Sequence, residues 1–161
     1  MRDFIRTLSD KINSASYAVA LTLLVILSTV LIIQIVTRYV LNSSLSWTEE
    51  IARYCFIWLH MLAAGICVKK KMHPSVSFLV NMTPARVQAV LAVTVNLLLI
   101  LAASILLLQG LKIAMLTMEQ PSPAVQVPLG LVYLAVPVGA FTMICHVLAD
   151  MFVGGNAAKQ P

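Results

Sequence analysis

The sequence contains very little charge. Only 11% of its 161 residues are charged, against about 25% in a typical soluble domain, and 60% are hydrophobic. Asp, Glu, Lys and Arg are missing from three long stretches, at residues 12–37, 87–111 and 120–149. Each stretch is longer than the roughly 20 residues that a helix needs to cross about 30 Å of hydrocarbon. This composition excludes a soluble enzyme or a nucleic-acid-binding module and predicts an integral membrane protein.

Cysteine is scarce as well, and Cys55, Cys67 and Cys145 form no C-x-x-C pair. Cys55 and Cys67 lie on one predicted helix, about 18 Å apart along its axis, which is too far for a disulfide. No His, Cys and Glu cluster occurs at ligand spacing, so the sequence predicts no metal site. The cysteines are predicted to pack as small apolar side chains.

The apolar stretches predict an all-α fold with one membrane domain at residues 15–153. Its four transmembrane helices are predicted at residues 15–37, 47–69, 84–111 and 128–149. Within the last of them, Pro137 lacks the amide proton that would bond the Tyr133 carbonyl, which predicts a kink. Ala135 and Gly139 flank this proline and would permit close helix approach.

The segments outside the spans are short. Residues 1–14 place apolar side chains at helical spacing among basic ones, which predicts an amphipathic segment in the membrane interface. The apolar loop at residues 72–83 is too short to span and predicts a second interfacial or re-entrant piece. Residues 154–161 are predicted to form a disordered tail.

The basic residues predict the orientation, because Lys and Arg concentrate on the cytoplasmic side of membrane proteins. With the N-terminus inside, eight of them are cytoplasmic: Arg2, Arg6, Lys11, Lys69, Lys70, Lys71, Arg86 and Lys159. Three are then outside: Arg38, Arg53 and Lys112. The sequence therefore predicts that both termini are cytoplasmic. The same concentration of Lys and Arg on the cytoplasmic side explains the net charge of +5 without a nucleic-acid partner.

Two histidines in the predicted spans raise the question of a function other than that of a supporting subunit. His60 is the only titratable side chain well inside the second span, and His146 lies near the inner end of the fourth. A small membrane redox protein that binds haem between them is one alternative. Their predicted heights, about 13 Å and 6 Å above the inner interface, differ too much for two axial ligands. A homo-oligomeric carrier or channel is another alternative, although the spans hold no charged pore lining.

Charged and aromatic residues gather at the predicted outer interface. This group comprises Arg38, Trp47, Glu49, Glu50 and Arg53. Glu49 and Glu50 are spaced to pair with Arg53 on one helix surface. The pattern Ser46-x-x-Glu49 predicts a capping box with Ser46 as N-cap. These residues serve either the local structure or, as the sharper hypothesis, a contact with a partner protein.

The same residues carry a resemblance to a known family. Residues 38–42, the block 46–54 with its Trp-Thr-Glu-Glu-x-x-Arg pattern, and residues 56–59 closely resemble the DctQ-type small subunit of tripartite ATP-independent periplasmic (TRAP) transporters. Residues 128–139 are similar to the fourth helix of that family. One departure follows the basic loop, where His73 precedes Pro74 and Ser77 stands in place of an acidic residue.

The resemblance implies a non-catalytic subunit of a sodium-driven importer of organic acids in the bacterial inner membrane. Its implied partners are a large multi-span transport subunit, a periplasmic substrate-binding protein and membrane lipids, with no cofactor. The outer-interface group would then stabilise the subunit contact or orient the second span. The transported acid stays open, because dicarboxylates, sialic acid and others are all compatible with the sequence.

Overall fold

The computed structural model of the chain describes residues 2–43, 45–70 and 84–153 and is helical over most of this length. Its helices are α1 (Arg2–Tyr39), α2 (Ser46–Lys69), α4 (Ala85–Leu116), α5 (Leu129–Tyr133) and α6 (Ala135–Val153). Four helical stretches are long and apolar enough to cross a membrane: Ile5–Tyr39, Ser46–Lys69, Val90–Leu116 and Leu129–Met151. The predicted all-α membrane fold with four spans is confirmed.

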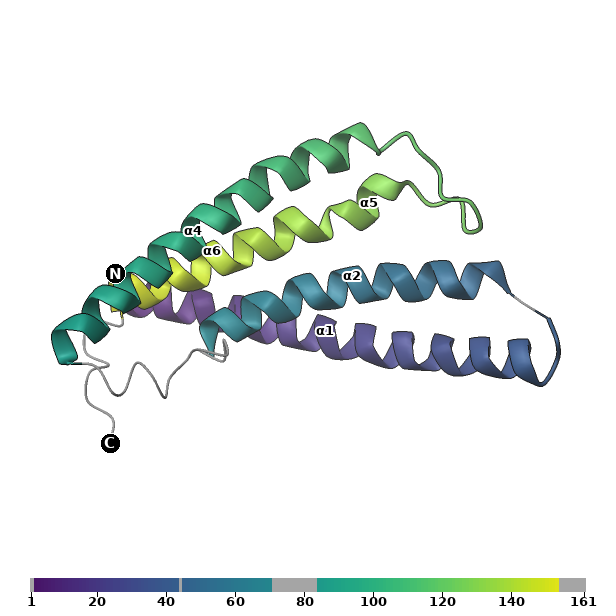
Figure 1. Cartoon of the computed structure of the whole chain (residues 1–161), viewed down its shortest axis with the longest axis horizontal. Helices are drawn as coiled ribbons and strands as arrows, with labels where there is room; N and C mark the ends of the chain where they lie inside the picture. The colour runs from purple at the N-terminus through teal and green to yellow at the C-terminus, as the bar shows by residue number, and fades with distance from the viewer. Residues whose placement is uncertain (1, 44, 71–83, 154–161) are drawn as a thin grey trace.

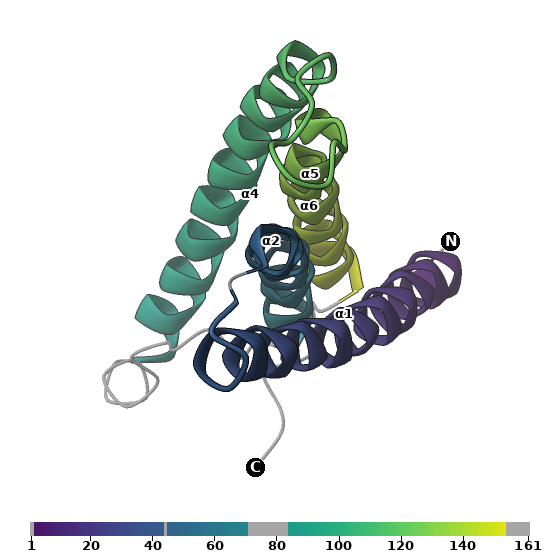
Figure 2. The same ribbon diagram turned by 90° about the vertical axis from the view of Figure 1, so that its right-hand side faces the viewer.

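The helices form two antiparallel hairpins (Figure 1). One hairpin consists of α1 and α2, and the other of α4 with α5 and α6. The central helix is α6, which packs against α1, α2 and α4, whereas the main contacts of α4 are with α5 and α6. The two hairpins diverge toward the end where α1 turns into α2, and α4 splays away from α2 in the second view (Figure 2). We call this the loop end and the opposite one the terminal end.

Small residues bring α2 and α6 together. A Cβ added to Gly139 would lie 2.8 Å from both the carbonyl oxygen and the Cβ of Met61. One added to Gly65 would collide with the Thr142 hydroxyl. Such contacts between backbones replace the hydrophobic effect as the force that holds helices together in lipid. The close approach predicted at Gly139 is therefore present, between α6 and α2.

Pro137 interrupts the last span as predicted. The helix breaks at Leu134, between α5 and α6, one residue after the Tyr133 carbonyl that proline leaves without an amide donor. Amide-to-carbonyl bonds from Leu134 to Gly130 and from Val138 to Leu134 continue on either side of the break. The break sets the direction of α5 and thereby the position of the loop before it.

The first helix differs from its predicted outline. Residues 2–14 are the opening turns of α1 and continue into the span without a break, so they do not form a separate helix lying in the interface. The expected apolar piece at residues 72–83 and the expected tail at 154–161 lie outside the described residues, as do His73, Pro74 and Ser77.

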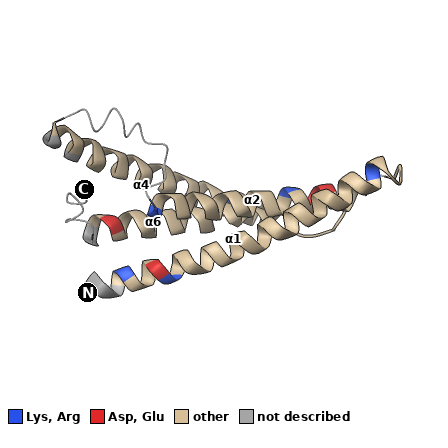
Figure 3. Ribbon diagram, turned by 90° about the horizontal axis from the view of Figure 1, so that it is seen from below, with Lys and Arg blue, Asp and Glu red and all other residues tan. Residues whose placement is uncertain are grey.

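Charged residues gather toward the two ends of the helices and leave uncharged stretches between them (Figure 3). At the loop end these are the charges of the predicted outer-interface group, and at the terminal end they come from α1, α2 and α6. This distribution is typical of a protein in which the middle parts of the helices lie in the hydrocarbon core of a membrane.

We expect Gly139→Ala to lower the free energy of unfolding in detergent by about 1–3 kcal/mol, because the new methyl group forces α6 away from the α2 backbone. Thermal unfolding followed by circular dichroism measures this. Ala102→Leu, on an exposed face of α4, is the control and should leave the unfolding temperature unchanged. Equal behaviour of the two variants would contradict the close contact.

Candidate functional site

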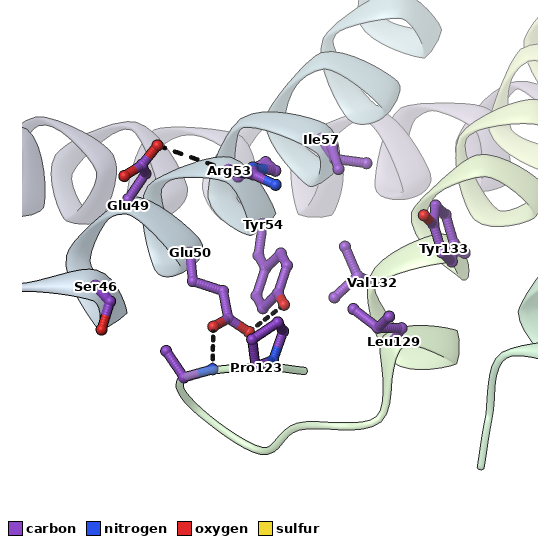
Figure 4. Close-up of a pocket in the computed structure, with 11 residues that line it drawn as sticks. Ser46, Glu49, Glu50, Arg53, Tyr54, Ile57, Pro123, Leu129, Val132 and Tyr133 are labelled. Atoms are coloured by element: carbon purple, nitrogen blue, oxygen red, sulfur yellow. Dashed lines mark hydrogen bonds and ion pairs between the residues drawn. The ribbon is translucent and has the colours of Figure 1, made fainter. Parts of the chain in front are cut away.

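The outer-interface group is centred on Glu50, whose side chain faces the loop before α5 (Figure 4). Its Oε2 accepts hydrogen bonds from the backbone amides of Ala124, at 2.7 Å, and Val125, at 3.3 Å. Its Oε1 accepts from the Tyr54 hydroxyl one helical turn along α2. Glu50 is only 8% exposed. The carboxylate is therefore a buried link between α2 and the loop.

The loop is built to present these two amides. Its ends pair through an antiparallel bridge between Pro121 and Pro128. The Ser122 amide donates to the Val127 carbonyl at 2.9 Å, and the fully buried Ser122 hydroxyl accepts from the Val127 amide. Gln126 adopts a positive φ of 58°, which closes the tip. The resulting tight turn aims the Ala124 and Val125 amides at Glu50.

Two other charged residues of α2, Glu49 and Arg53, lie on a more exposed face than Glu50. Glu49 and Arg53 form an ion pair with an N–O distance of 3.9 Å, and their side chains are 59% and 67% exposed. The expected second pairing, of Glu50 with Arg53, is not among the ion pairs of the described residues. Figure 4 shows Glu50 and Tyr54 directed toward the loop and the Glu49–Arg53 pair on the opposite side. The sequence-based group thus divides into a buried half and an exposed half.

Two members of the group lie apart from this contact. Arg38 is exposed in the last turn of α1 and forms no ion pair within the described ranges. Trp47 is partly exposed in the first turn of α2. Both lie at the loop end, where the positive φ of Asn42 accompanies the end of α1 in the predicted turn.

The predicted capping box is wrong. α2 begins at Ser46 with Leu45 as its N-cap, and no side chain caps the helix. Instead, the buried Thr48 hydroxyl donates to the Leu45 carbonyl at 2.7 Å. Glu49 lies on the exposed side and pairs with Arg53, so its carboxylate is engaged elsewhere.

An open pocket of about 440 Å³ lies between α2, the loop and α5. Its walls are mainly apolar and include Ile57, Leu129 and Val132, while Glu49, Glu50 and Arg53 border it. The described residues that line it include no cysteine or histidine. The pocket marks where the two hairpins separate.

A second polar cluster, which the sequence reasoning did not find, joins three helices at the terminal end. The Lys69 ammonium at the end of α2 lies 2.5 Å from Asp10 and 3.2 Å from the Ser9 hydroxyl, both on α1. Ser9 in turn contacts His146 Nδ1 on α6, at 2.9 Å. Ser9 and Asp10 precede the first apolar stretch and Lys69 ends the second, so a hairpin of the two spans places them at one level.

The order of donors in this cluster favours one tautomer of His146. Lys69 can only donate, so the Ser9 oxygen accepts from it. The Ser9 hydroxyl can then donate its proton to His146 Nδ1, which lies 2.9 Å away. This order of donors favours the tautomer of neutral His146 whose ring proton is on Nε2, an atom that is buried and has no partner among the described residues.

The two histidines of the haem alternative are not brought together. His146 is 2% exposed and packs against α1. His60 lies exposed on α2, and its Nδ1 is 2.9 Å from the carbonyl of Phe56 in its own helix. The described residues contain no group of three or more His, Cys, Asp and Glu side chains that could hold a metal ion.

Comparisons with known proteins agree on one family. The model of the DctQ component of tripartite ATP-independent periplasmic transporters matches residues 27–154. A Haemophilus influenzae protein assigned as a TRAP transporter small permease protein is 34% identical over 131 residues, which are 81% of each chain. The Vibrio cholerae sialic acid TRAP transporter small permease protein SiaQ is 30% identical over 105 residues, or 64% of this chain and 61% of SiaQ.

A further relative is much longer than this chain. The isethionate TRAP transporter permease protein DctMQ of Oleidesulfovibrio alaskensis is 34% identical over 107 residues. These residues are 65% of this chain but only 17% of DctMQ.

We expect Glu50→Ala to lower the unfolding temperature in detergent clearly, because it leaves the Ala124 and Val125 amides in the contact without an acceptor. Glu50→Gln should lower it less, since the amide oxygen still accepts. The matched control is Glu49→Ala, which removes an exposed carboxylate with an effect of at most about 1 kcal/mol. Protease cleavage within residues 121–128 should rise only in the Glu50 variants; equal cleavage in Glu49→Ala would contradict the anchoring role.

The hydrogen bonds of His146 and His60 predict that their ring protons are on different nitrogens. We expect nitrogen-15 spectra of histidine-labelled protein at neutral pH to show His146 protonated on Nε2 and His60 protonated on Nδ1, where the Phe56 carbonyl accepts. Ser9→Ala should abolish the preference at His146 and leave His60 unchanged. The same tautomer at both residues would refute the assignment, and His73→Asn removes the third histidine signal.

Proposed function

Because the chain belongs to the DctQ components of tripartite ATP-independent periplasmic transporters, we propose that it is the non-catalytic small membrane subunit of a three-part importer. The family match over residues 27–154 carries this proposal. The four helices that could span a membrane fit a multi-pass subunit. In the proposed complex the chain packs against a large transport subunit and stabilises it.

The long relative supports a large membrane partner. DctMQ contains a region similar to this chain within a much longer permease protein. Fusion of such a segment to a larger permease in one organism supports a tightly bound separate subunit in another. The proposed partner is thus a membrane protein several times the size of this chain. A periplasmic substrate-binding protein completes the importer and docks on the loop end.

The proposed cargo is an organic acid, carried by the large subunit with a sodium gradient. Relatives are named for isethionate, sialic acid and C4-dicarboxylates, all of which are anions at neutral pH. The exposed mid-helix surfaces of α1, α4 and α6 carry no charged side chain that could bind such an anion. Substrate recognition in this proposal therefore belongs to the other two subunits.

The proposed location is the bacterial inner membrane with both termini in the cytoplasm. The excess of Lys and Arg at the terminal end supports this orientation, with six of the described ones there and three toward the loop end. The loop that Glu50 anchors and the Glu49–Arg53 pair would then face the periplasmic side.

Affinity purification of the tagged chain from its native membranes tests the proposal. We expect mass spectrometry to find a large polytopic membrane protein in near-stoichiometric amount. We also expect the chain alone to transport no organic acid into liposomes, whereas the co-purified complex with its binding protein does. Recovery of the chain only with copies of itself, in a detergent that preserves complexes, would contradict the proposal in favour of a homo-oligomeric carrier or channel.

A further inference from the structure

One exposed face of α2 differs from the other exposed helix surfaces. We define the α2 stripe as Glu49, Arg53, Phe56 and His60, which are all exposed, Phe56 by 52%. Their spacing of four, three and four residues places them within an arc of about 60° on an α-helix. The stripe lies between the face that buries Ala52 and Cys55 and the face whose Glu50 meets the loop.

The stripe extends deep into the apolar part of the span. Along the helix axis, His60 is about 21 Å from Ser46 and about 13 Å from Lys69. The hydrocarbon core of a bilayer is about 30 Å thick, so His60 lies near its middle. In contrast, the exposed middle parts of α1, α4 and α6 carry no Asp, Glu, Lys, Arg or His.

The stripe offers a specific hydrogen-bonding group. His60 Nδ1 lies 2.9 Å from the Phe56 carbonyl, which can only accept, so Nδ1 carries the proton. The lone pair of Nε2 is then an acceptor on an exposed side chain. The Phe56 ring packs beside the imidazole, with 3.8 Å between ring centroids, and holds it in place. The stripe thus presents a fixed acceptor, an aromatic ring and an ion pair.

Lipid tails cannot satisfy these groups, because they contain no donor or charge. Ionisable side chains within spans almost always face a protein interior or a water-filled cavity. Within the described residues, no other helix covers the stripe, since α2 packs against α1, α6 and α5 on its other faces. Glu49 and Arg53 also border the pocket beside α5, so the stripe and the pocket form one continuous surface.

We propose that the α2 stripe is the surface against which the large membrane subunit packs, with a hydrogen-bond donor of that subunit at His60 Nε2. This inference rests on the proposed function. It assigns different tasks to the two sides of α2: Glu50 anchors the chain's own loop, and the stripe binds the partner.

Substitution of His60 separates a protein contact from a lipid contact. The measured quantity is the large subunit recovered per copy of this chain after washing in detergent. His60→Phe removes the acceptor and should reduce recovery about three- to tenfold, the effect of one hydrogen bond between membrane helices. His60→Gln keeps an acceptor and should retain most of it. Leu108→Phe, on an exposed face of α4, is the control and should have no effect. Unchanged or improved recovery with His60→Phe would overturn the proposal.

Photocrosslinking in native membranes locates the contact directly. A photoreactive amino acid at Phe56 should crosslink to the large subunit, whereas the same group at Val25 on α1 or Leu108 on α4 should not. Crosslinks to the large subunit only from Val25 or Leu108 would overturn the stripe and leave the proposed function intact. Crosslinking of Phe56 to a second copy of this chain would overturn the stripe as a subunit contact. Absence of any large subunit from the purified wild-type complex would refute the proposed function itself.

Discussion

The Glu50 carboxylate is the contact on which the geometry of the loop end depends. The two hairpins diverge there, and Glu50 on one of them binds two backbone amides that belong to the loop of the other. Irregular backbone at the edge of a membrane needs partners for its amides, because hydrocarbon supplies none. A carboxylate meets this need well, since it accepts several hydrogen bonds at once and charge strengthens each of them. The link holds the loop against α2 beside the open pocket.

The terminal end is held together by different means. The Lys69, Ser9 and His146 series joins α1 and α2 to α6 there, and Gly65 packs against the Thr142 side chain. Nearer the middle of α2, Gly139 lets α6 approach the Met61 backbone. At the terminal end the helices are therefore joined by close packing and polar contacts. At the loop end the two hairpins diverge and are linked by the bond of Glu50 to the loop before α5. The described helices are thus broadly spread at the loop end and do not form a closed four-helix bundle.

The first turns of α2 carry a buried polar contact on one face and an exposed ion pair on another. Glu49 and Glu50 are consecutive but have different partners: Glu49 forms an exposed ion pair, and Glu50 forms a buried link to the loop. A helix turns by about 100° per residue, which places the two carboxylates on different faces of α2, although both border the pocket. The buried link of Glu50 and the exposed pair of Glu49 with Arg53 therefore differ in partner, even though both belong to one end of one helix.

The sequence by itself determined the membrane class, the four spans and the break near Pro137, because hydropathy, span length and proline chemistry are local properties of the chain. It also identified the charged turn of α2, but it failed on how that turn is used: the expected Ser46 cap is absent, and Glu50 bonds a loop 74 residues away. The sequence also did not predict the contacts among Ser9, Lys69 and His146. Which side chains meet depends on the rotation and tilt of packed helices, and only the tertiary structure decided those.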